Sequence, residues 1–469
     1  MLHVIKYVLG SGTRSWVKKW IYLFVLLILY DGVFRKWLLP GMSNELMVLK
    51  ILVAFFIIIS GRRYLNRLTF WDGGLVILGT IGFLTTLIFG HGNITVALWG
   101  CLPFWLIPVC PIISKALNRK DIFIIMEIFV YTAIVNFLFT VFEFSQPLDS
   151  FINQESFENE ELNDLSAGDL AGLFRPSGIF IHNSQSCSFV LLAFSFCLYL
   201  YYSKGKKINR AALYLAMISC LLTPLFTVSR TMVFYVIGMI LVFFYFSLAK
   251  GRLHKVFIPI LIGLMALPLF FSTQIGDSAV VNMLNRFENA SLATTGGNES
   301  SGYGNLEDIF NRTVVYNIKA ITDPHTLDGE VPPFFGFGQG MSTQVGGRLL
   351  GIKGHAGFAL AEWDGLRIMC ESGYLLGWLI IFFRLGYAFR FLGRFKRSNP
   401  NKLSIFLYPS FLVSFFVMNT WGNAFFFCFA LLCGGLYLAS INRKNEFGKK
   451  SVKGVQQLKV TEVQQPDNQ

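Results

Sequence analysis

Apolar segments long enough to cross a bilayer recur along almost the whole chain, and the short connections between them are alternately rich and poor in Lys and Arg. Soluble domains contain about 25% charged residues, whereas here 14% are charged and 54% are hydrophobic. Lys and Arg concentrate in the cytoplasmic loops of membrane proteins. The basic connections contain Arg62, Arg63 and Arg67, then Lys115, Arg119 and Lys120, then Lys204, Lys206, Lys207 and Arg210, then Lys250, Arg252 and Lys255, and finally Arg390, Arg394, Lys396 and Arg397. The sequence therefore predicts an all-α polytopic membrane protein, whose net charge of +13 orients its spans and requires no nucleic-acid partner.

We expect about 12 transmembrane helices, with both termini in the cytoplasm. They cover residues 20–39, 44–60, 70–90, 93–113, 121–143, 178–202, 210–226, 230–249, 255–272, 366–385, 403–419 and 423–441. Residues 1–272 hold the first nine spans and a short acidic outer loop at 144–177. Residues 273–365 form a large extracytoplasmic loop with short helices, 366–441 hold the last three spans, and 442–469 form a disordered cytoplasmic tail.

Cysteine and histidine usage argues against a metal site or a disulfide framework. All eight cysteines fall in apolar segments, and neither Cys-x-x-Cys nor a His/Asp/Glu spacing typical of a metal site is present. The glycine-rich stretch 336–340 lacks the flanking strand and helix of a dinucleotide-binding loop, so we interpret it as a tight turn. We expect neither a metal nor another cofactor.

Five arginines interrupt the charge pattern, because they fall in outer segments or at the outer ends of spans: Arg175, Arg230, Arg312, Arg348 and Arg367. Positive charge has no topological role there. Arg175 begins a segment in which Pro176 and Gly178 favour a turn, and His182 and Asn183 follow about one turn deeper. Either Arg175 is an anchor that reaches lipid phosphates, or these polar groups line an aqueous cavity.

Arg230 lies in the outer turn between the seventh and eighth expected spans. Ser229 can cap the following helix, whose N-terminus attracts anions and disfavours a purely structural cation. Arg367 and Glu371 are four residues apart on one helix face, so they either neutralise each other or face a cavity.

Charged residues also fall inside the first two expected spans, where an isolated charge is costly. Asp31 and Arg35 are four residues apart, and we expect them to pair. Lys50 lies about two turns into the second span, so it requires either Asp31 or a substrate phosphate as its partner.

These segments follow one another in a specific order: RPSGIFIHN before one span, SRT in the next outer turn, a large outer loop ending in GFGQG, a histidine, and then EWDGLRIMCESGYLLG. The series covers about residues 170–385 and resembles the O-antigen ligase and O-antigen polymerase superfamily of bacterial membrane glycosyltransferases. The resemblance implies a GT-C-like helical fold in the bacterial cytoplasmic (inner) membrane, with the active site facing the periplasm. It also implies a metal-independent polymerase that transfers oligosaccharide repeats from a polyprenyl (undecaprenyl) diphosphate to a growing glycan or a lipid acceptor.

The resemblance further implies roles for single residues. The arginines that would hold the donor diphosphate are Arg175, Arg230, Arg312, Arg348 and Arg367. The base that accepts the proton of the acceptor hydroxyl would be His355 or Glu371. The candidate supporting residues are His182, Asn183, Ser229 and Lys50. Membrane lipids and a chain-length regulator are the further partners that it allows.

Three other functions fit part of this pattern. An O-antigen ligase would transfer the glycan to lipid A-core instead of extending it. A lipid-linked oligosaccharide flippase or another transporter would also have many spans, but it needs ionisable groups near the bilayer midplane rather than in the outer third. A non-enzymatic assembly or chain-length factor would not need this many charges within the membrane.

Overall fold

The computed structural model describes residues 16–147, 150–153, 175–203, 208–248, 272–294, 315–325, 330–350, 364–389, 402–417 and 423–442. Within these residues all regular secondary structure is helical. The ninth expected span lies outside them except for its last residue, and so do Arg312, His355 and the tail after residue 442.

The helices of the first part of the chain follow the first six expected spans. They are α2 (Trp16–Val33), η1 (Phe34–Leu38), η2 (Pro40–Met42), α3 (Ser43–Ser60), η3 (Arg62–Arg67), α4 (Phe70–Phe89), α5 (Ile94–Trp105), α6 (Val109–Ala116), α7 (Arg119–Ser145), η4 (Phe151–Asn153) and α9 (Asn183–Ser203). A turn at 106–108 separates α5 from α6 and contains Pro108. Proline has no N–H to continue a helix, so one expected span consists of two helices.

The second part of the chain contains the remaining elements. They are α10 (Arg210–Phe226), α11 (Arg230–Leu248), α13 (Gln274–Thr294), α15 (Tyr316–Thr322), α16 (Gln344–Leu350), α18 (Asp364–Phe389), α20 (Lys402–Leu412), η6 (Val413–Val417) and α21 (Ala424–Asn442). In the part of the chain that is described, seven helical segments are long and apolar enough to cross a membrane, and α10 and α20 are shorter apolar helices. The chain is therefore an all-α, multi-pass membrane protein.

Side-chain caps explain where several helices begin. Thr69 and Asp72 form a capping box at the start of α4, and Asn118 and Asp121 form another at the start of α7. In a capping box each side chain accepts a hydrogen bond from the backbone N–H of the other residue, which satisfies two helix-terminal donors. Asn93 caps α5 in a similar way.

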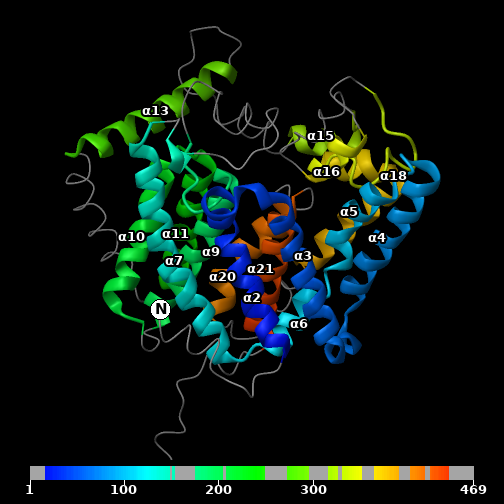
Figure 1. Cartoon of the computed structure of the whole chain (residues 1–469), viewed down its shortest axis with the longest axis horizontal. Helices are drawn as coiled ribbons and strands as arrows, with labels where there is room; N and C mark the ends of the chain where they lie inside the picture. The colour runs from blue at the N-terminus through cyan, green and yellow to red at the C-terminus, as the bar shows by residue number, and fades with distance from the viewer. Residues whose placement is uncertain are drawn as a thin grey trace, which may run out of the picture.

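The helices α9 and α21 form the centre of the bundle (Figure 1). In their membrane-crossing windows 89% and 94% of the residues are buried, against 33% in α4 and in α11. The central helix α21 contacts α3, α6 and α20, and α9 contacts α7, α10, α11 and α20. The helices α4, α5 and α18 pack together on one side of this centre, and α7, α10 and α11 pack on the other.

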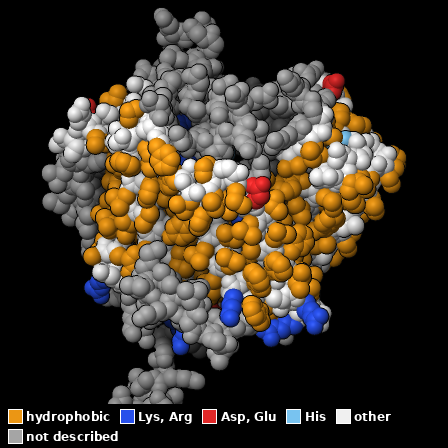
Figure 2. Space-filling model, in the orientation of Figure 1, with side chains coloured by type: hydrophobic (Ala, Val, Ile, Leu, Met, Phe, Trp, Pro, Cys, Tyr) orange, Lys and Arg blue, Asp and Glu red, His pale blue; other side chains and the backbone are white. Residues whose placement is uncertain are grey.

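One end of the bundle is basic, and we call it the basic end. Exposed Lys and Arg side chains occur there, where α2, α7 and α10 begin and where α3 ends: Lys19, Arg62, Arg63, Arg119, Lys120 and Arg210. Figure 2 shows a broad belt of hydrophobic side chains with Lys and Arg along its lower edge. A belt bordered by basic residues is what a membrane-embedded bundle needs.

The other end of the bundle, which we call the opposite end, contains η1, η2 and the N-termini of α9 and α11. The large outer loop places α13, α15 and α16 toward this end (Figure 1). Short helices in this loop were expected, and α15 and α16 have seven residues each. The 21-residue helix α13, which contacts α10, was not expected.

Candidate functional site

The segment 175–182 enters the bundle as an irregular chain, whereas the sequence predicts a span from residue 178. The helix α9 begins only at Asn183. Gly178 has φ +66°, and a Cβ atom at this position would collide with the Asn136 side chain. Because only glycine adopts this backbone conformation without strain, the motif turns here instead of continuing as a helix.

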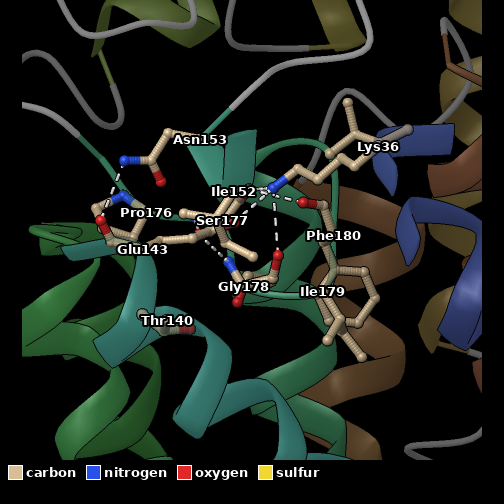
Figure 3. A network of polar contacts seen from close by, with 12 residues as sticks. Lys36, Thr140, Glu143, Ile152, Asn153, Pro176, Ser177, Gly178, Ile179 and Phe180 are labelled. Atoms are coloured by element: carbon tan, nitrogen blue, oxygen red, sulfur yellow. Dashed lines mark hydrogen bonds and ion pairs between the residues drawn. The ribbon is translucent and has the colours of Figure 1, made fainter. Parts of the chain in front are cut away.

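Lys36 and Glu143 hold this turn (Figure 3). The Glu143 carboxylate accepts hydrogen bonds from the backbone N–H groups of Ser177 and Gly178, at 2.8 and 2.7 Å. Lys36 forms an ion pair with Glu143 at 2.8 Å and donates to the Ser177 hydroxyl at 2.7 Å. Lys36 belongs to η1, a π-helical turn; such turns recur at functional sites.

Two asparagines extend this network around the turn. Asn136 accepts a hydrogen bond from the backbone N–H of Ile179 and donates one to Ser186. Asn153 donates to backbone carbonyls at the end of α7, including that of Glu143. Buried amides in such positions satisfy backbone groups that the missing helical turn leaves open.

Asn183 joins this segment to the turn before α11. Its side-chain amide donates to the Thr227 carbonyl at 2.7 Å and to the Pro176 carbonyl at 3.4 Å. The Ser229 hydroxyl accepts a hydrogen bond from the backbone N–H of Met232 and so caps α11. The N-termini of α9 and α11 therefore lie side by side at the opposite end of the bundle.

The turn before α11 is strained. Val228 is fully buried and has φ +47°, which is rare for a β-branched residue. A residue held in such a conformation costs on the order of 1–3 kcal/mol, and such residues cluster at functional sites. Arg230 follows directly as the first residue of α11, and both Arg230 and Arg175 are partly exposed. The structure thus brings together the two segments that carry these arginines.

Lys50 has the partner that the sequence allowed. Its ammonium forms an ion pair with the Asp31 carboxylate at 2.5 Å, and Arg35 approaches the same carboxylate at 3.4 Å, so the expected pairing of Asp31 with Arg35 is confirmed. Lys50 and Asp31 are buried, which makes their mutual neutralisation necessary. One carboxylate therefore faces two cations here.

His182 lies directly before α9, in surroundings that keep its imidazole neutral. Burial, and then the positive charges of Arg35 and Lys36, lower the pKa of His182 to about 4. A neutral imidazole offers one N–H donor and one nitrogen acceptor for hydrogen bonds.

Glu371 and Arg367 lie in a second network, on the far side of α3 and α21 from α9 and α11 (Figure 1). Arg367 donates to Glu371 at 3.3 Å, so these residues do pair along one helix face. The same carboxylate accepts hydrogen bonds from the backbone N–H and the hydroxyl of Ser342. This network attaches the large outer loop to α18, and the structure does not bring Arg367 and Glu371 together with Arg175 and Arg230.

The glycine-rich stretch 336–340 is a tight turn, as the sequence predicts, and it fits between α4, α5 and α18. Gly336, Gly338 and Gly340 all have positive φ. Gln339 contacts all three helices, since it accepts a hydrogen bond from Cys101, its backbone N–H donates to Thr86 and its amide donates to Ser372. No strand flanks the turn in the part of the loop that the structure describes.

The structure describes the other expected site residues only in part. Arg348 lies in α16, but its side chain is outside what the structure describes, as are Arg312 and His355 entirely. Among the described residues, no three His, Cys, Asp or Glu side chains lie together in a way that could hold a metal ion.

Sequence reasoning missed Glu143 and Asn136. The signal for Glu143 was available, because it is an acid near the end of a mostly apolar span, at the same end of the bundle as Lys36. The two residues are 107 positions apart, so only their common depth in the membrane could have suggested the pair.

The geometry defines a class: an all-α multi-pass membrane protein with paired buried charges at the end of the bundle that faces its large loop. Comparisons with known proteins name no particular family, because no family model matches the chain and no curated protein matches its sequence.

Proposed function

We propose that this chain is a membrane glycosyltransferase of the GT-C-like kind, which polymerises oligosaccharide repeats delivered on a polyprenyl diphosphate. One observation carries this proposal. The segments bearing Arg175 and Arg230 meet at the N-termini of two neighbouring helices, joined by Asn183. Helix N-termini and arginines both favour a doubly charged phosphate group, and they lie at the end of the bundle opposite the basic end.

The chemistry needs these groups at one point. The acceptor hydroxyl attacks the anomeric carbon of the donor, the bond from that carbon to the diphosphate oxygen breaks, and the leaving diphosphate takes the electron pair. Preorganised arginines stabilise the charge that develops on its oxygens. A base takes the hydroxyl proton, and we assign that role to His355, because the Glu371 carboxylate is engaged by Arg367 and Ser342.

The membrane orientation follows from the same proposal. The basic end faces the cytoplasm of a bacterium, and the opposite end with its large loop faces the periplasm. An O-antigen ligase would use the same donor site, so only the acceptor, a growing glycan or lipid A-core, separates the two activities.

A lipid-linked oligosaccharide transporter is the second candidate, and the buried Asp31–Lys50 pair favours it. Lys50 is the eighth of the 18 residues of α3, so this pair lies near the middle of that helix, where a transporter would use it. We prefer the enzyme because the segments that bear Arg175 and Arg230 meet at the end of the bundle.

The proposal is tested by Arg175→Lys and Arg230→Lys. Lysine keeps the charge but lacks the planar fork that binds two phosphate oxygens at once. Charge-assisted hydrogen bonds contribute about 1.5–3 kcal/mol each, so each variant should lose roughly ten- to a hundredfold in polymerisation rate. The assay measures glycan formed from a polyprenyl diphosphate-linked oligosaccharide by the purified full chain.

The matched control is Arg210→Lys, because Arg210 is exposed at the basic end. It should polymerise at the wild-type rate. Wild-type rates for both Arg175→Lys and Arg230→Lys, at normal protein levels, would reduce these arginines to membrane anchors. Movement of the lipid-linked donor across vesicles without glycosyl transfer would favour the transporter.

A further inference from the structure

The ion pair between Lys36 and Glu143 is placed to do more than join two helices. Both side chains are buried, at 4% and 1% exposure. Their hydrogen bonds converge on Ser177 and Gly178, the second and third residues after Arg175 (Figure 3). Four separate bonds, three to backbone groups and one to the Ser177 hydroxyl, thus end on the two residues that directly follow the Arg175–Pro176 step.

A second pair offers an internal comparison. Lys18 and Asp121 form an ion pair at 2.5 Å between the N-terminal ends of α2, which η1 continues, and α7. Asp121 also caps α7 and accepts a hydrogen bond from Tyr22, so these contacts join α2 to α7. One pair therefore stabilises helix packing, whereas the other contacts the irregular segment 175–182.

Stability alone is a weak reason for the Lys36–Glu143 pair. Removing two charges from water costs about as much as their attraction returns, and apolar side chains of similar size often stabilise a core more. What the pair adds is a fixed direction for the chain, since Glu143 binds the two successive N–H groups that lead into the turn at Gly178, a conformation that glycine adopts easily.

We propose that Lys36 and Glu143 are positioning residues that orient the 175–183 segment, and through it the Arg175 guanidinium, for glycosyl transfer. This inference rests on the proposed function. Neither side chain is assigned a contact with the substrate; both act through Arg175. A displacement of about 1 Å in a group that stabilises the transition state can cost about a hundredfold in rate.

A double-mutant cycle tests this coupling in the purified full chain. Lys36→Met should lower the polymerisation rate about ten- to a hundredfold. If Lys36 acts through Arg175, Lys36→Met combined with Arg175→Lys should be no slower than about the slower single variant, because the same interaction is lost once. Fold-losses that multiply in the double variant would overturn the proposal.

Two further variants keep the test decisive. Lys18→Met breaks the comparison pair, and its effect should multiply with that of Arg175→Lys. Lys36→Met combined with Glu143→Gln leaves no isolated buried charge, so it should insert at normal levels and still polymerise slowly. A wild-type rate for that double variant would contradict a positioning role.

A measurement without activity separates the two proposals. Ser184 directly follows this segment in α9 and is exposed, and the eight native cysteines are buried, so a spin label at Ser184→Cys reports motion where the segment joins α9. Lys36→Met should increase the mobility of the label, and Lys18→Met should not. Increased mobility in a chain that transfers no sugar would keep the positioning role and remove the proposed function. If Lys36→Met leaves the mobility of the label unchanged and the wild-type chain polymerises, the positioning role is removed and the proposed function is kept.

Discussion

At the scale of single residues, the pKa of His182 reports on burial and positive charge at the candidate site, and the dependence of stability on pH can measure it. Its pKa is lowered to about 4, first by burial and then by Arg35 and Lys36. Below the ordinary histidine pKa of about 6.5 the unfolded chain binds a proton that the folded chain does not, until the pH falls to about 4. Stability is therefore lost as the pH falls through this window.

We expect His182→Asn to remove part of that loss. At pH 5 the wild type should lose on the order of 2 kcal/mol relative to pH 7.5 through this residue. Asparagine does not titrate, so the variant should show a smaller drop in melting temperature between the two pH values. Thermal unfolding in detergent measures both. Equal drops would mean that His182 is protonated in the folded chain.

Ion pairs between residues close in sequence were predicted, whereas contacts between distant residues were not. The pairings of Asp31 with Arg35 and of Arg367 with Glu371 follow from helical spacing, and Asp31 was one of the two partners expected for Lys50. The partner of Lys36 was not predicted, since helical spacing says nothing about two residues on separate helices. The bond from Asn183 to Thr227 was out of reach for the same reason.

At the scale of elements, a close approach between α2 and the 175–183 segment sets where that segment lies. A Cβ atom added to Gly32 would collide with the Ile179 carbonyl and the Phe180 backbone. Backbone atoms cannot move aside as flexible side chains do. Gly32→Ala should therefore displace the segment that Lys36 and Glu143 hold.

The expected result of Gly32→Ala is a loss of about 1–3 kcal/mol of stability, as in other overpacked cores, together with a slower polymerisation rate. Gly238→Ala in α11 is the control, because nothing lies within 4 Å of a Cβ atom there. It should keep the wild-type rate, with equal or higher stability. Both variants are compared in melting temperature and polymerisation rate. If Gly32→Ala matches Gly238→Ala in both, the 175–183 segment can shift without loss of stability or activity.

The positions of elements were largely predictable, and their interruptions were not. Apolar length and capping residues place α4, α7, α10 and α21 within a few residues of the expected spans. The turn at Pro176 and Gly178 was predicted, but the late start of α9 was not, because hydropathy does not register how Lys36 and Glu143 hold that turn. The amphipathic helix α13 was missed because a search for long apolar segments passes over a helix of mixed composition.

At the scale of the whole molecule, charge and connectivity together determine the orientation. α11 begins at the opposite end, where Asn183 contacts the turn before it, and so it ends at the basic end. The next described helix, α13, lies at the opposite end and contacts α10 (Figure 1). The ninth expected span would return the chain to that end, and all of it but its last residue lies outside the described residues.

Cysteine labelling tests that return directly. The eight native cysteines are buried, so a cysteine introduced at an exposed position should react with little background. Leu68 lies at the basic end and Val331 in the large loop, with 36% and 56% of their surfaces exposed. In intact cells freed of the outer membrane, a maleimide that does not cross membranes should label Val331→Cys and not Leu68→Cys. Lysis should make both react, because we expect the basic end to face the cytoplasm. Labelling of both positions before lysis would place the large loop and the basic end on one side, which removes the ninth span and, with it, the periplasmic site.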